Sequence, residues 1–133
     1  AGEALRPLDR IASGGEISRV MLALKELIAG RDLVSVLVFD EIDAGISGHI
    51  ASAVGRKLQA LSDSHQIIVI THLPQIASLA NHHFSVRKRK LGQRTITEVA
   101  TLDKKARTEE IAYLLAGDTI SSTALQHAQE MLQ

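Results

Sequence analysis

The stretch Leu33-Val34-Ser35-Val36-Leu37-Val38-Phe39-Asp40-Glu41 decides the fold. It is short, largely apolar and rich in β-branched residues, and it ends abruptly in two carboxylates. The run Leu33–Phe39 therefore predicts a strand that is covered on both faces. A second run of this kind, Ile67–Ile70, ends in Thr71-His72. We expect two buried strands, each followed directly by polar side chains.

One helix is expected between these strands. A loop, Ile42–Gly48, follows the first strand, and Ser47 could cap the helix after it. Apolar residues recur in this helix at helical spacing: Ile50, Val54, Leu58 and Leu61. Strand, helix and strand together make a βαβ unit with a right-handed crossover. The pattern predicts an α/β fold, with a mostly parallel sheet flanked by helices.

Further elements are expected on both sides of this unit. Residues 1–12 are expected to be extended, with Pro7 among them, and Ser13-Gly14-Gly15-Glu16 predicts a capping box. The helix that follows should stop at Gly30, and its apolar residues are Ile17, Val20, Met21, Leu24, Leu27 and Ile28. Downstream we expect a short helix, a β-hairpin with one solvated face and two closing helices on either side of Gly117. Their expected ranges are Pro74–Ala80, Phe84–Lys90 with Thr95–Thr101, Thr108–Leu115 and Ser122–Leu132.

Composition narrows the class of protein. The 133 residues suit one domain, 1–133, and the aromatic residues are only Phe39, Phe84 and Tyr113, so the core must be aliphatic. The absence of cysteine excludes disulfides and thiolate metal sites. A formal net charge of zero gives no global electrostatic argument for nucleic acid or membrane. No stretch approaches the ~18 apolar residues of a membrane span and no signal peptide opens the chain, so no membrane partner is expected.

The strand ends carry the candidate chemistry. Ligands of open parallel sheets bind outside the carboxyl ends of the strands. There, Asp40 could hold Mg²⁺, and Glu41 could orient or deprotonate an attacking water. The alternatives are that the acidic pair caps a turn and that His72 is only a hydrogen-bonded polar residue.

The helix start at Ser13-Gly14-Gly15 suits an anion. Glycines let the backbone approach closely, and the free amides and the helix dipole favour negative charge. An ordinary N-cap is the alternative. The sequence contains no G-x-x-x-x-G-K-[ST] segment, so we do not expect the chain to cradle ATP phosphates on its own.

In their order along the chain, these motifs resemble those of an ABC-type ATPase head. The signature in its S-G-G-E form is at Ala12–Arg19, and the Walker B strand is at Val36–Glu41. The D-loop is at Ile42–Gly48, and the switch or H-loop is at Ile68–His72. Ile42 stands where transporter ATPases typically have proline, which favours the SMC-like branch. The implied fold is the C-terminal lobe of the head, with the P-loop lobe and the coiled coil absent from this sequence.

Within that branch the chain resembles the RecN family of bacterial double-strand-break repair ATPases. The resemblance rests on Leu5-Arg6-Pro7-Leu8, Asp43–Gly48, Thr71–Ala77 and the tail from Glu109 to Leu132. It implies ATP and Mg²⁺ as cofactors, hydrolysis across a head–head homodimer, and a role in DNA repair and recombination in the bacterial cytoplasm at the nucleoid. The implied partners are DNA and the P-loop lobe of the same protein, without which this chain would be inactive.

The resemblance also implies residue roles. Asp40 would serve the Mg²⁺ ion, Glu41 the attacking water, and His72 the γ-phosphate held by its own head. The γ-phosphate held by the partner head would be contacted by Ser13, Gly14, Gly15 and Glu16. The seam of the dimer would contain Asp43, Ala44 and Gly45.

The predicted hairpin is basic, and two interpretations stay open. Arg87-Lys88-Arg89-Lys90 and Arg94 could contact the DNA backbone, independently of sequence and with strong salt dependence. Alternatively, the charges only protect an edge strand from pairing with other chains.

Two other functions are alternatives for the chain as a whole. One is a non-catalytic dimerisation module gated by nucleotide, which the presence of Glu41 disfavours. The other is an ABC transporter ATPase lobe, which Ile42 and the S-G-G-E form disfavour.

Overall fold

The computed structural model describes residues 12–31, 33–92 and 94–133. These residues fall into two compact units, a first unit that ends at His72 and a second unit, Leu73–Gln133. The segment predicted to be extended, with Leu5-Arg6-Pro7-Leu8, lies outside the described residues apart from Ala12. In the described part of the chain, every helix is too short or too polar to cross a lipid bilayer.

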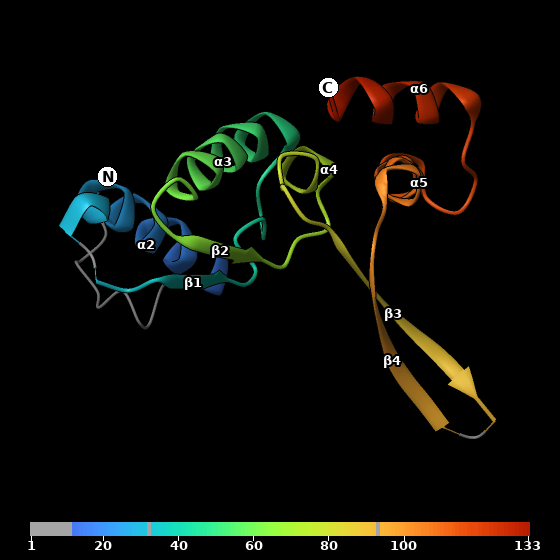
Figure 1. Cartoon of the computed structure of the whole chain (residues 1–133), viewed down its shortest axis with the longest axis horizontal. Coiled ribbons are helices and arrows are strands. Elements are labelled where there is room, and N and C mark those ends of the chain that lie inside the picture. The colour runs from blue at the N-terminus through green and yellow to red at the C-terminus, as the bar shows by residue number, and fades with distance from the viewer. Residues whose placement is uncertain (1–11, 32, 93) are drawn as a thin grey trace, which may run out of the picture. The chain divides into compact units, whose positions relative to one another are not determined.

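The first unit contains the predicted βαβ arrangement (Figure 1). Its elements in chain order are helix α2 (Gly14–Ile28), the 3₁₀ turn η1 (Ala29–Arg31), strand β1 (Val36–Phe39), helix α3 (Gly48–Leu61) and strand β2 (Gln66–Val69). The strands pair in parallel, with Val36 opposite Gln66 and Phe39 opposite Val69. The parallel pairing is confirmed, although β1 begins three residues after the predicted start at Leu33.

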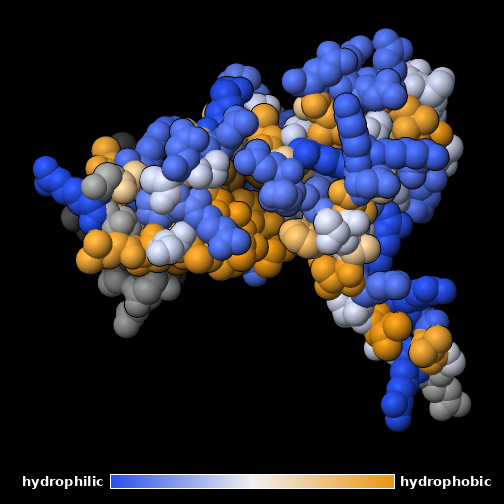
Figure 2. All heavy atoms as spheres, in the orientation of Figure 1, coloured by the Kyte–Doolittle hydropathy of each residue, from blue (hydrophilic) through white to orange (hydrophobic). Residues whose placement is uncertain are grey.

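Only one face of this sheet is covered. Phe39 is 3 % exposed, whereas Val38, which points to the other face, is 62 % exposed. Val36 and Ile68 share the open face with Val38 and are also exposed. The prediction that the first strand is buried on both faces is therefore wrong, because the side chains on its second face are exposed. Figure 2 shows hydrophobic surface in the region of these strands.

Helix α2 is likewise open on its apolar side. All six apolar residues that recur at helical spacing in this helix are exposed, and Leu27 is 83 % exposed. Leu22, on the opposite side, is 2 % exposed. Helical spacing identifies an apolar face but not what covers it.

Helix α3 packs largely as predicted. Val54, Leu58 and Leu61 are buried, but Ile50 in its first turn is exposed. Ser47 is the N-cap residue by position, yet its side chain makes no capping hydrogen bond.

The second unit contains a hairpin and three helices. They are α4 (Pro74–Ala77), β3 (Phe84–Leu91), β4 (Arg94–Thr101), α5 (Lys104–Ala116) and α6 (Ser122–Met131). Its core cluster consists of Ala77, Ile111, Ala112 and Ala128. Arg107 of α5 donates hydrogen bonds to the carbonyls of Ser78 and Ala80, which ties the end of α4 to this core. Gly117 ends α5 with a φ of 72°, as its position between the two helices led us to expect.

The hairpin is confirmed, but the prediction of one solvated face is wrong. Ser85 is the one buried residue among those described in β3 and β4. Within the second unit, the hairpin extends away from α5 and α6 (Figure 1). Both of its faces are therefore solvated over most of their length.

Two leucines of α2 test this description of the first unit. Leu22→Ala should lower the free energy of unfolding by about 2–5 kcal/mol, because it removes a buried side chain and leaves a cavity. Leu27→Ala, in the same helix, should change it by less than about 0.5 kcal/mol. Urea unfolding measures both values. Similar losses for the two variants would mean that the apolar side of α2 is covered in solution.

Candidate functional site

The start of α2 is closed by its own side chains. Ser13 Oγ accepts a hydrogen bond from the Glu16 amide at 3.3 Å, and Glu16 Oε2 accepts from the Ser13 amide at 2.8 Å and from its hydroxyl at 2.9 Å. The bond from the Ser13 amide is the largest cause that lowers the pKa of Glu16, and the bond from the hydroxyl adds to it. The predicted capping box is confirmed, and the Glu16 carboxylate is engaged in it.

The two glycines after Ser13 let α2 lie directly against the loop that follows β1. A Cβ on Gly15 would come within 2.7 Å of the Glu41 carbonyl oxygen and 2.9 Å of the Ala44 Cβ. A Cβ on Gly14 would come within 2.7 Å of Glu41 Oε2. Only glycine fits at Gly15 without moving backbone. We expected these glycines to let an anion approach the backbone. In the structure they also let α2 pack against the loop that follows β1.

Polar side chains of α2 then hold the same loop. Ser18 Oγ donates to the Asp40 carbonyl at 3.0 Å. Arg19 Nη1 donates to the carbonyls of Ile42 at 3.1 Å and Ala44 at 2.9 Å. Sequence reasoning gave Ser18 and Arg19 no role of their own. Their helical positions, three and four residues after Gly15, were the signal that they share its face of the helix.

The acidic pair lies exposed at the carboxyl end of β1. Asp40 Oδ1 accepts from the Glu41 amide at 2.9 Å. Glu41 has a φ of 55°, a left-handed conformation that costs a residue other than glycine about 1–2 kcal/mol. Strain of this kind is common at functional sites. It turns the chain sharply, so that the Ala44 amide donates back to the Glu41 carbonyl at 2.9 Å.

The chemistry of this pair fits a hydrated cation. Within residues 12–31, 33–92 and 94–133, no three His, Asp or Glu side chains are grouped so that they could hold a metal ion. Asp40 offers one exposed carboxylate at the end of β1. Mg²⁺ is commonly held in this way, by one or two carboxylates together with water and phosphate oxygens.

Asp43 links the loop to the end of the second strand. Its side chain is 4 % exposed, and Oδ2 accepts from Thr71 Oγ1 at 2.6 Å and from the His72 amide at 2.9 Å. The same oxygen lies 3.0 Å from His72 Nδ1, while the His72 side chain is 74 % exposed. Burial alone would raise the pKa of Asp43, but these hydrogen bonds outweigh it and hold the pKa below its ordinary value.

The first unit thus brings together the signature, the acidic pair and the switch. Phe39 and Val69 are register partners, so both strands deliver their next residues to one edge of the sheet. Ala44 and Gly45, which we predicted at a dimer seam, lie in the same loop. Sequence reasoning missed Thr71 as a partner of Asp43, although its place beside His72 at a strand end could have suggested it.

The basic hairpin belongs to the second unit, and part of its charge is paired. Arg87 Nη2 lies 2.5 Å from Glu110 Oε2, and its guanidinium carbon lies 5.3 Å from the centre of the Tyr113 ring. Arg87 Nε also donates to Ser85 Oγ at 3.2 Å. The hydrogen bond to Glu110 is the main cause that raises the pKa of Arg87. Arg87 is thereby tied to α5.

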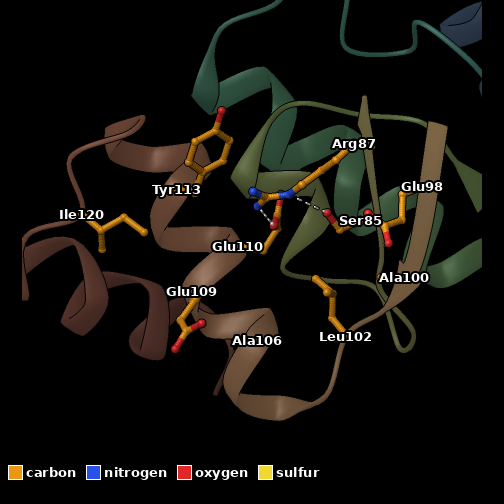
Figure 3. Close-up of a pocket in the computed structure, with 10 residues that line it drawn as sticks. All are labelled: Ser85, Arg87, Glu98, Ala100, Leu102, Ala106, Glu109, Glu110, Tyr113 and Ile120. Atoms are coloured by element: carbon orange, nitrogen blue, oxygen red, sulfur yellow. Dashed lines mark hydrogen bonds and ion pairs between the residues drawn. The ribbon is translucent and has the colours of Figure 1, made fainter. Parts of the chain in front are cut away.

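These contacts border a shallow hollow of about 410 Å³ in the second unit. Figure 3 shows the Arg87 side chain reaching across it toward Glu110 and Tyr113. The hollow is also lined by Glu98 and Glu109. Its single arginine is already paired, so its lining favours no anion.

Comparisons with known proteins first define the class. A solved structure from work on ATP-driven dimerization and DNA-stimulated activation of SMC ATPases matches with a TM-score of 0.60. The match covers 90 % of this chain and 71 % of that chain, at 22 % sequence identity. The chain therefore shares the fold of that structure, which confirms the predicted fold class. A search against protein-family models found no match.

Curated sequences then identify the family. The chain is 53 % identical over 133 residues to the DNA repair protein RecN of Treponema pallidum, 51 % identical over 131 residues to that of Deinococcus radiodurans, and 40 % identical over 132 residues to that of Bacillus subtilis. These matches cover 98–100 % of this chain but 23 % of each relative. The chain belongs to the RecN family and corresponds to the C-terminal region of its members.

The Asp43 contacts predict a pH-dependent contribution to stability. Asp43→Asn should lower the free energy of unfolding at pH 7 by about 1.5–3 kcal/mol, the range for hydrogen bonds to charged groups. Because folding lowers the pKa of Asp43, its contribution is complete above the ordinary carboxyl pKa of about 4 and is lost as the pH falls through the folded value. The difference between the two proteins in urea unfolding should therefore shrink between pH 7 and pH 3.

Asp63→Asn is the matched control, because Asp63 is an exposed carboxylate at the end of α3. It should change stability little at either pH. If the loss caused by Asp43→Asn were the same at pH 7 and pH 3, the ionised carboxylate would not be the stabilising group.

Proposed function

We propose that this chain is the C-terminal lobe of a RecN-type ATPase head, acting in DNA double-strand-break repair. The observation that supports the proposal most is the hydrogen-bonded link from Asp43 to Thr71 and His72, which brings the acidic strand end and the switch together. ATP and Mg²⁺ are the proposed cofactors. The full-length family member is the proposed enzyme, and the chain by itself is proposed to be inactive because it lacks a P-loop.

Each polar group at this edge has a proposed task in phosphoryl transfer. Asp40 would supply one oxygen ligand to Mg²⁺, the ion that neutralises charge on the phosphates. Glu41 would hold the attacking water and accept its proton. His72, with Nδ1 directed at the Asp43 carboxylate, has its Nε2 available for a phosphate oxygen when the ring is protonated. Positioning and charge stabilisation supply most of the catalysis in this reaction class.

The uncovered apolar faces support the proposal that another lobe packs against the first unit. The open face of β1 and β2 and the apolar side of α2 expose large aliphatic side chains on three elements of the first unit. Contiguous apolar surface of this kind marks interaction sites. We propose that the P-loop lobe of the same protein covers at least one of these faces.

The signature residues would act on a second head. Ser13 would contact the γ-phosphate held by the partner, to which Gly14 and Gly15 would present their backbone amides. Gly14 lies close to the Glu41 carboxylate. The residues proposed to act on the partner's nucleotide are therefore adjacent to a residue proposed to act on the nucleotide of the same head. Asp43 faces inward, so Ala44 and Gly45 would provide the contacts at the seam.

Glu41→Gln tests the enzymatic proposal. This chain would replace the corresponding region of the Treponema pallidum RecN, which it matches at 53 % identity, to give a complete protein. The chimera should hydrolyse ATP. The Glu41→Gln chimera should be slower by about 100-fold or more, because a general base contributes roughly that factor. It should accumulate as an ATP-bound dimer, which gel filtration would detect.

Glu109→Gln, which removes an exposed carboxylate of α5 in the other unit, should leave hydrolysis unchanged. Normal turnover by the Glu41→Gln chimera would contradict the role of Glu41. A chimera that binds ATP and dimerises but never hydrolyses it, even in a single turnover, would instead favour a non-catalytic dimerisation module. Turnover by the 133-residue chain alone would contradict its predicted inactivity.

A further inference from the structure

The two faces of the hairpin differ in composition because side chains alternate along each strand. One face carries the register pairs Ser85–Ala100, Arg87–Glu98, Arg89–Ile96 and Leu91–Arg94. The other face carries the pairs Phe84–Thr101, Val86–Val99, Lys88–Thr97 and Lys90–Thr95. We call these the arginine face and the lysine face. The basic run Arg87-Lys88-Arg89-Lys90 is therefore divided between two surfaces.

The arginine face carries its own counter-charges. Arg87 is paired with Glu110 of α5, and Arg89 Nη1 lies 3.7 Å from Glu98 Oε2 across the strand pair. Arg87 is also held by Ser85 and lies over Tyr113. An external polyanion would have to compete with these carboxylates. This face is poorly suited to bind one.

The lysine face has no acidic residue among its eight positions. Lys88 and Lys90 are exposed, and the described residues form no ion pair with either. Two residues apart on a strand, their Cα atoms are about 7 Å apart on one face. Opposite them lie Thr97 and Thr95, whose exposed hydroxyls can donate to phosphate oxygens.

We propose that the lysine face of the hairpin binds the phosphate backbone of duplex DNA. Two unpaired cations and neighbouring hydroxyls, with no carboxylate between them, complement a regular row of phosphates. The inference deepens the proposed function by assigning the DNA contact to Lys88, Lys90, Thr95 and Thr97. It excludes the arginines that the sequence pattern had grouped with them.

The experiment compares two double variants with equal charge changes on opposite faces. K88Q/K90Q and R89Q/R94Q each remove two positive charges from the same hairpin. Binding of the 133-residue chain to a short labelled DNA duplex is measured by fluorescence anisotropy over a series of salt concentrations. No nucleotide is present, so the result does not depend on whether the family site hydrolyses ATP. Circular dichroism verifies that both variants stay folded.

K88Q/K90Q should weaken binding at low salt by about tenfold or more and should reduce the magnitude of the slope of log affinity against log salt by about two. R89Q/R94Q should stay within about twofold of the original chain. Equal weakening by both variants, or no DNA binding by the unsubstituted chain, overturns the proposal. Phe84, Val86 and Val99 form an exposed apolar base to the lysine face. If V86A/V99A abolished binding while K88Q/K90Q retained it, the face would be an apolar docking site instead.

Discussion

The carboxylate of Asp43 is the group on which the arrangement of the first unit depends. It is buried, and its hydrogen bonds come from the hydroxyl of Thr71 and the amide of His72. A buried charge without partners costs several kcal/mol, so the loop after β1 and the chain after β2 cannot separate without a large penalty. One side chain thus holds together the ends of two strands, and with them Glu41 and His72.

Helix α2 reaches the same loop by close packing and by hydrogen bonds to its carbonyls. Gly15 lies against the Glu41 carbonyl, and Arg19 donates to two carbonyls that would otherwise lack partners in a partly buried turn. Unpaired buried backbone groups are costly, which makes Arg19 a structural residue rather than a spare cation. The strained backbone of Glu41 is maintained by these contacts on both sides. Helix α2 is therefore in direct contact with the segment that carries Glu41.

Much of the local structure was predictable from sequence, and most of what failed concerned contacts distant in the chain. The capping box at Ser13 and Glu16, the parallel strands and the hairpin follow from patterns a few residues long. The exposed side of α2 could not be foreseen, because an apolar stripe looks the same whether its cover is present or absent. The pairing of Arg87 with Glu110 spans 23 residues, and a run of basic residues does not reveal such a partner. The strand register did reveal, once the hairpin was in place, which cations share a face.

The proposed chemistry lies at the edge of the sheet where β1 and β2 end. The central claim is that Asp43 fixes the switch segment to the loop carrying Glu41. The most direct test is the hydrogen-exchange rate of the His72 backbone amide, measured by NMR on the 133-residue chain. The His72 amide should be protected to a degree similar to the Ile70 amide, which is bonded to the Phe39 carbonyl in the sheet, even though the His72 side chain is exposed. Exchange at the rate of an unstructured loop would contradict the link through Asp43.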